Sequence, residues 1–203
     1  MSNLASTLRA LGEVKEAIVL DEQVLAVRRR VLGPSHADSL TSLNAVGVAR
    51  GGLGDLSGAR SLLEEAMGER VRILGAVHPD TLASMSELAN VLLAQGEVAA
   101  SRELQEQVLA TRIDVLGSEH PDSLTSLERL ALALRQEGHL KRATELLEQV
   151  VQARSRLQGE EHPHTLEAMK QLADTLKILG DFNGFSRWLE RVSEIQSRLL
   201  KRR

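Results

Sequence analysis

The segment Leu116-Gly-Ser-Glu-His-Pro-Asp-Ser-Leu124 contains the pattern from which the architecture of this chain can be inferred. The same order of Leu-Gly, His-Pro-Asp and Leu occurs at 74–82. A step of 42 residues separates the members of two independent glycine series, Gly33, Gly75, Gly117 and Gly159, and Gly12, Gly54, Gly96, Gly138 and Gly180. Self-similarity at a fixed period of this size is typical of repeat proteins.

Between the glycines, apolar residues recur at helical spacing, as at Leu82, Met85, Leu88 and Leu92. Glycine suits the end of each helix, where the chain needs a positive φ, and proline suits the first turn of the next one. No sustained alternation of period two competes with this pattern. Each repeat is therefore predicted to be two antiparallel helices, which makes the fold class all-α.

A single helix pair cannot bury its apolar side alone, so neighbouring pairs must stack into an α-solenoid. We expect a single solenoid of about ten helices over residues 1–203. The expected repeats are 1–33, which is incomplete, 34–75, 76–117, 118–159, and 160–203, which includes a C-terminal cap. Since the first repeat lacks a His-Pro start, the chain is expected to be either a fragment of a longer protein or unusually bare at its N-terminal end.

Composition excludes several classes of function. The 203 residues carry a net charge of −3 and 1% aromatic residues, which offer neither a basic surface nor stacking platforms for nucleic acid. The sequence has no cysteine, so it forms no disulfide, and a reducing, cytoplasmic location is expected. Its apolar runs are far shorter than the roughly 18 residues that a membrane helix needs.

The Leu-Gly-x-x-His-Pro-Asp pattern resembles the 42-residue tetratricopeptide repeat of kinesin light chains and of related bacterial and fungal scaffold proteins. Small residues occupy the positions where that family packs its two helices closely: Ala5, Gly47, Ala89, Ala131 and Ala173 on the first helices, and Ala17, Ala59, Ser101 and Ala143 on the second. Armadillo repeats have a similar length but three helices, and they fit this sequence less well. The resemblance implies a noncatalytic scaffold that binds a protein or peptide.

In that family the first helices line a concave groove. The resemblance places the following residues on it: Asn3 and Ser6; Thr41, Asn44, Ala45 and Val48; Ser86, Glu87 and Asn90; Thr125, Glu128, Arg129 and Leu132; and Glu167, Lys170, Gln171 and Asp174. The paired asparagines that hold cargo peptides in kinesin light chains are reduced here to scattered amides. Two alternatives to a peptide-binding groove stay open. The first is a solvated face without a dedicated ligand, and the second is a self-assembly module that stacks through the ends of the solenoid.

The recurring histidines, His36, His78, His120 and His162, belong to successive layers about 8 to 10 Å apart, too far for one metal ion. We expect them to cap the following helices. The recurring arginines, Arg28, Arg70, Arg112 and Arg154, are expected either to bridge to acidic groups in their own or the next repeat or to remain separate solvated charges. No nucleophile, base and orienting group occur together, so the sequence predicts no enzyme, no cofactor and no metal site.

Two segments depart from the repeat. Residues 51–58 are rich in glycine but lack a phosphate-binding motif, and we predict that Gly47, Gly51 and Gly52 make the second helix pair the loosest part of the array. The aromatic residues Phe182, Phe185 and Trp188 lie in the last helix. They are expected either to fill the core of a cap or to form an exposed patch, and a homo-oligomer would use that patch or the N-terminal end.

Overall fold

The computed structural model describes residues 14–201, which contain nine helices and no strand. The helices are α2 (Val14–Leu32), α3 (Ala37–Gly52), α4 (Leu56–Leu74), α5 (Pro79–Ala94), α6 (Val98–Leu116), α7 (Pro121–Gln136), α8 (Leu140–Gln158), α9 (Pro163–Leu179) and α10 (Phe182–Lys201). The prediction of an all-α fold is confirmed. The further helix expected at the N-terminus, with Asn3, lies outside the described residues.

From Gly33 to Gly180, the described members of both glycine series mark the turns between helices. Gly33 and Gly75 follow α2 and α4 with φ angles of 94° and 89°, values that favour glycine because it has no Cβ atom. The turns before α3, α5, α7 and α9 end in histidine, whose Nδ1 atom accepts a hydrogen bond from the backbone N–H two residues later. The expected capping role of these histidines is confirmed.

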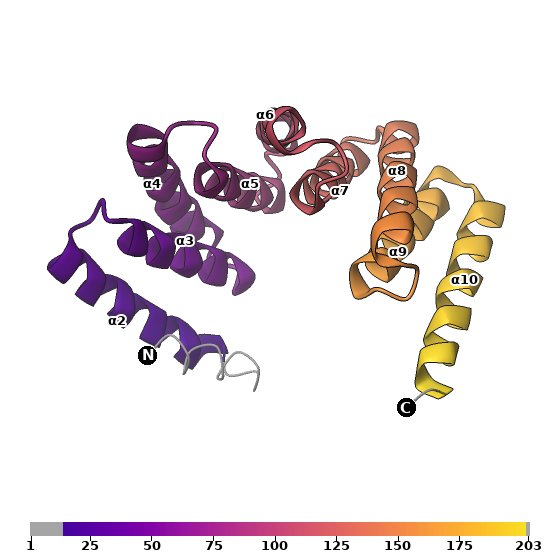
Figure 1. The fold of residues 1–203 in the computed structure, drawn as a ribbon, viewed down its shortest axis with the longest axis horizontal. Helices are drawn as coiled ribbons and strands as arrows, with labels where there is room; N and C mark the ends of the chain where they lie inside the picture. The colour runs from indigo at the N-terminus through magenta and orange to yellow at the C-terminus, as the bar shows by residue number, and fades with distance from the viewer. Residues whose placement is uncertain (1–13, 202–203) are drawn as a thin grey trace. The chain divides into compact units, whose positions relative to one another are not determined.

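The chain forms two compact units, an N-terminal unit of residues 1–104 and a C-terminal unit of residues 105–203, with the boundary inside α6. In the N-terminal unit α2 packs on α3, α3 on α4 and α4 on α5 (Figure 1). In the C-terminal unit α7 to α10 pack on one another in the same consecutive way. This is the packing of an α-solenoid, whereas the expected division into five repeats stays a prediction. We call α3, α5, α7 and α9 the first helices and the others the second helices.

The cores lie between successive helices. In the N-terminal unit Leu40 and Leu43 of α3 are buried, as is Leu63 of α4. Gly47 allows α3 and α4 to approach closely, because a Cβ atom there would lie 2.9 Å from Leu63 Cγ. The sequence pattern places a small residue at position 47, and the close approach of Leu63 is the steric reason for it.

The last helix fills the core of the C-terminal unit with two of its three aromatic side chains. Phe185 and Trp188 pack against the buried cluster that includes Leu146 and Leu172, while Phe182 is 65% exposed. The Nζ atom of Lys177 lies 5.4 Å from the centre of the Phe185 ring. Phe185 and Trp188 are half-buried against this cluster, which favours core filling for these two residues, whereas Phe182 is exposed and the expected patch stays a prediction.

Candidate functional site

The first helices of the N-terminal unit bring part of the expected face together. Asn44 on α3 is half-buried, and its Oδ1 atom accepts a hydrogen bond of 2.8 Å from the hydroxyl of Ser84 on α5. Asn90 and Glu87 are also half-buried, and the Asn90 side-chain amide donates to Glu87 Oε2 at 3.2 Å. Ser86 is only 1% exposed, so its expected place on a ligand-binding face is wrong.

The face of the C-terminal unit is more highly charged. Arg129 and Gln171 are half-buried, and Lys170 and Asp174 are exposed. Lys170 forms a loose ion pair of 3.8 Å with Glu167. These four side chains are at least partly exposed to solvent, whereas Glu128 has a different environment.

Glu128 lies beneath this face in a bidentate ion pair with Arg154 of α8. The two N–O distances are 2.7 and 2.8 Å, and the side chains are 12% and 6% exposed. Burial raises the pKa of Glu128 to about 6, while the charge and hydrogen bonds of Arg154 oppose that rise. The expectation that Glu128 contacts a ligand is replaced by a structural role, because its carboxylate is committed to a buried cation.

The recurring arginines connect successive helix pairs, mainly through neutral acceptors. Arg70 donates to the backbone carbonyl of Asp80 at 2.9 Å and to the hydroxyl of Ser84 at 2.8 Å. Arg28 and Arg112 make the equivalent contacts one repeat before and one repeat after. In the last of the series the serine position is occupied by Ala168, and Arg154 pairs with Glu128. The expected acidic partner is thus confirmed for Arg154, while Arg28 and Arg70 use carbonyl and hydroxyl groups.

A pocket of about 200 Å³ opens between α3 and α5 in the N-terminal unit. We call it the glycine pocket. It is lined by Val48, Gly51, Gly52, Leu56, Leu63, Glu87, Asn90, Val91 and Ala94. The walls are apolar, and the polar groups are the side chains of Glu87 and Asn90. Sequence reasoning missed this pocket, although its signal was the Gly51-Gly52 pair where the next repeats have Leu93-Ala94 and Arg135-Gln136.

A second hollow, of about 400 Å³, lies in the C-terminal unit between α9 and α10 and includes Lys170, Asp174 and Leu189. Leu189 is 49% exposed, whereas Leu147, one repeat earlier, is 2% exposed against its neighbours. Leu189 is therefore an exposed apolar side chain at a position that is buried at Leu63, Gln105 and Leu147.

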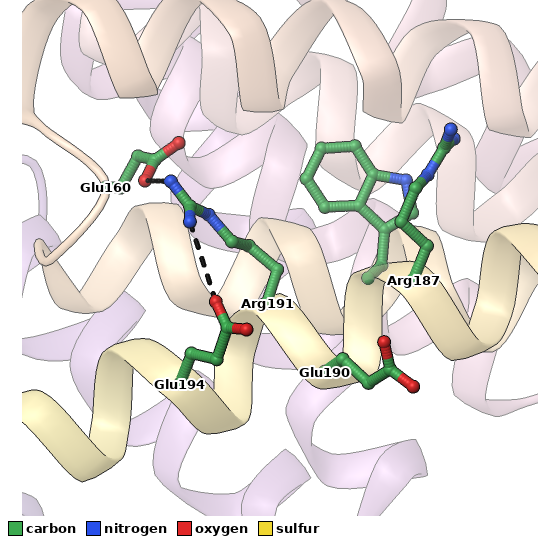
Figure 2. A pocket seen from close by; sticks show the side chains of 6 residues that line it. Glu160, Arg187, Glu190, Arg191 and Glu194 are labelled. Atoms are coloured by element: carbon green, nitrogen blue, oxygen red, sulfur yellow. Dashed lines mark hydrogen bonds and ion pairs between the residues drawn. The ribbon is translucent and has the colours of Figure 1, made fainter.

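A third hollow, of about 390 Å³, lies beside α10 and is drawn in Figure 2. Arg191 extends from α10 to Glu160 in the turn before α9 and also lies 3.6 Å from Glu194 (Figure 2). Arg187 and Trp188 border the same hollow. Because the guanidinium group of Arg191 is engaged by both Glu160 and Glu194, we assign the hollow to the packing of α10 and not to ligand binding.

The part of the chain that the structure describes has neither a metal-binding cluster nor a membrane-spanning helix. Residues 14–201 contain no cluster of three or more histidine, cysteine, aspartate or glutamate side chains able to hold a metal ion. Within the same residues no helix has both the length and the apolar character that crossing a bilayer demands.

Comparison with known proteins identifies the repeat. The tetratricopeptide repeat family matches residues 1–68 and 80–155. A crystal structure of a Podosopora anserina protein, named as a kinesin light chain with nearly identical TPR-like repeats, is 35% identical to this chain. The match covers 98% of this chain and 94% of that one, with a TM-score of 0.82. Among curated proteins no sequence matches.

Two more distant structures agree in fold. BtubC (BKLC) from P. vanneervenii is 16% identical, with a TM-score of 0.80, over 97% of this chain and 78% of that one. The apo form of RapI is 10% identical, with a TM-score of 0.77, over 97% of this chain and 69% of that one. At these identities the similarity concerns the fold alone.

Proposed function

The chain belongs to the tetratricopeptide repeat family and is of the kinesin light chain-like type, and we propose that it is a noncatalytic scaffold for protein–protein interaction. The ligand is a peptide or protein segment that binds on the face formed by the first helices. In this proposal the chain works in the cytoplasm, possesses no cofactor of its own, and serves as one portion of a larger regulatory protein.

One observation carries the proposal. Each first helix buries one side in the core and leaves polar side chains accessible on the other, including Glu87, Asn90, Arg129, Lys170 and Asp174. Polar and charged groups on a rigid scaffold supply the oriented hydrogen bonds that give specificity to peptide recognition. The related fold supports the proposal by analogy only, because one fold serves many functions.

A selection of short random peptides displayed on phage, with the whole chain as bait, tests the proposal. Selected peptides are expected to bind the wild-type chain and to lose affinity for a variant with Glu87, Arg129 and Asp174 all changed to Ala. The matched control changes Glu64, Arg142 and Glu145 to Ala, which removes two acids and one base from second helices. Equal affinity for both variants, or no selected peptide at all, would contradict the proposal.

Self-assembly is the second candidate, and the exposed Leu189 is the observation that favours it. Leu63 and Leu147, its equivalents in earlier repeats, are buried against neighbouring helices, so this surface suits a further helix. Light scattering over a range of concentrations tests this candidate. A rise in mass that Leu189→Lys abolishes supports assembly through this end, and a constant monomer mass excludes it.

A further inference from the structure

The start of α9 differs in charge from the starts of the other first helices. Two residues after the capping histidine, α3, α5 and α7 each have an aspartate, whereas α9 has His164. Among the first helices that the structure describes, α9 alone has no acidic side chain in its first turn. A carboxylate at this end of a helix is stabilising and a cation is destabilising, because the helix dipole is positive there.

The backbone of His164 is held from both sides. Its N–H donates to Nδ1 of His162 at 3.2 Å, and its carbonyl oxygen accepts a hydrogen bond of 2.9 Å from Nη1 of Arg154 on α8. These two bonds fix the first turn of α9 against the helix before it. We call Arg154, His162 and His164 together the α9 joint.

The cap at this joint requires His162 to be unprotonated at Nδ1. A backbone N–H can only donate, so its partner must offer a lone pair, and an imidazolium ring has a proton on both nitrogens. Histidine is the residue type whose charge ordinarily changes between about pH 5 and 8. Protonation of His162 therefore breaks the cap of α9.

The charges nearest to the joint add to this effect. The rings of His162 and His164 have their centres 5.3 Å apart, so two imidazolium groups would repel each other beside the guanidinium group of Arg154. At the start of α7, by contrast, Asp122 Oδ2 lies 3.9 Å from His120 Nδ1, and this carboxylate would attract a charged ring.

Other charged groups lie on the elements around the α9 joint. Most are already paired: Glu128 with Arg154, Glu160 with Arg191, and Glu167 with Lys170, while Glu161 lies in the turn before the cap. Glu128 shares the guanidinium group that holds His164, so its titration is separated experimentally below.

We infer that the α9 joint is an acid-sensitive joint of the fold, at which protonation of His162 and His164 opens the first turn of α9 more readily than the first turns of α3, α5 and α7. An opened turn has no cap to lose, so opening takes up protons. The stability of the joint is therefore present above the histidine range and is lost as the pH falls through it. This direction is opposite to that expected for a carboxyl group whose pKa is raised by burial.

Hydrogen exchange of the whole chain tests the inference on four matched amides. The backbone N–H groups of Leu40, Leu82, Leu124 and Leu166 each donate to the carbonyl oxygen of the capping histidine at 3.0 Å. Between about pH 7.5 and about pH 5.5 the protection of Leu166 should fall about fivefold or more relative to that of Leu124, since loss of a helix cap changes an opening equilibrium by about this factor. A ratio that stays constant would overturn the inference.

Two variants identify the groups responsible. His162→Asn keeps a side-chain acceptor that takes up no proton, and it should make the ratio independent of pH. His164→Asp restores the carboxylate of the other first helices and should give Leu166 the pH response of Leu124. The matched control is His139→Asn, because His139 occupies the N-cap of α8 without a side-chain hydrogen bond and should leave the response of Leu166 unchanged.

Glu128→Gln separates the histidines from the acid that binds the same arginine. The pKa of Glu128 is about 6, so this group titrates over part of the same range. A response of Leu166 that survives in Glu128→Gln and disappears in His162→Asn supports the inference. The reverse result would assign the response to Glu128 and overturn it.

Discussion

The guanidinium group of Arg70 and the hydroxyl group of Ser84 form a buried hydrogen bond of 2.8 Å that joins the C-terminal part of α4 to the first turns of α5. The same Nη1 atom lies 2.9 Å from the carbonyl oxygen of Asp80, and Arg70 is 5% exposed. Burial lowers the pKa of Arg70, an effect that the nearby charge of Asp80 partly offsets. A buried cation with neutral acceptors thus links one helix pair to the next.

Replacing Arg70 should therefore be costly. Arg70→Met keeps the length of the side chain but leaves the Ser84 hydroxyl and the Asp80 carbonyl without this donor, and we expect a loss of about 3 kcal/mol in the free energy of unfolding. Arg72→Met is the control, because Arg72 is 62% exposed and such surface ion pairs contribute about 0 to 1 kcal/mol. Urea denaturation of both variants checks the prediction, and equal losses would contradict it.

Glu128 should make stability depend on pH. Its pKa is raised from 4.5 to about 6, so the folded chain binds more protons than the unfolded chain between these values. Stability from this group is therefore present below pH 4.5 and is lost as the pH rises through about 6, by a total of about 2 kcal/mol. The groups that act on the carboxyl are Arg154, Glu167 and Arg129.

Glu128→Gln cannot titrate and isolates this effect. Urea denaturation of both proteins at a series of pH values between about 4.5 and 7 should show the wild type losing stability relative to the variant as the pH rises. Parallel curves for the two proteins would show that Glu128 does not couple to folding in this way.

The histidine caps give a further prediction. His78 Nδ1 accepts a hydrogen bond of 3.2 Å from the Asp80 amide at the start of α5. His78→Ala should lower the free energy of unfolding by about 1 kcal/mol, while His78→Asn should retain most of it, since asparagine accepts the same bond. Thermal unfolding of the two variants compares them directly, and an alanine variant as stable as the asparagine variant would argue against a capping contribution.

The helices, their turns and their caps could be predicted from the sequence because each depends on local chemistry that recurs every 42 residues. Within the described residues the glycines of both series have φ angles between 85° and 94°, and the histidines cap the first helices. The burial of Ser86 and the identity of Glu128 as the acidic partner of Arg154 could not be predicted, because they depend on how neighbouring helices rotate about their axes. Arg70 donates its hydrogen bond to the main-chain carbonyl of Asp80, ten residues later in the sequence. Because the acceptor is a main-chain group, no side-chain pattern marks it.

The glycines of α3 differ in their surroundings, and the expectation that they make the second helix pair the loosest stays a prediction. Gly47 is a close-packing residue, as the tetratricopeptide pattern implies. Gly51 and Gly52 were treated as a weakness of the helix, whereas in the structure they also line a pocket. The Gly51-Gly52 pair marks where side chains are missing, but only the coordinates show that their absence leaves a pocket.

Gly47 and Gly68 should respond to alanine in opposite directions. At Gly47 the new Cβ atom would lie 2.9 Å from Leu63 Cγ and 3.4 Å from the Ala59 carbonyl oxygen, so crowding of about 1 to 3 kcal/mol outweighs a gain in helix propensity of up to about 1 kcal/mol. At Gly68 a new Cβ atom would meet nothing within 4 Å, so only the gain in helix propensity remains. Thermal unfolding should therefore rank Gly68→Ala above the wild type and Gly47→Ala below it. Shortening Leu63 to Val in the Gly47→Ala background should relieve part of the loss.

The last turn of α3 should exchange its amide hydrogens faster than the last turn of α5. The two turns occupy equivalent positions, but α3 ends in Gly51-Gly52 and α5 in Leu93-Ala94, and each glycine reduces helix stability by up to about 1 kcal/mol. Gly52→Ala should slow exchange in this turn by up to about fivefold, because 1 kcal/mol corresponds to roughly that factor in an opening equilibrium. Hydrogen exchange followed by NMR makes the comparison within one molecule. Protection in α3 equal to that in α5 would mean that the glycine pocket imposes no local instability.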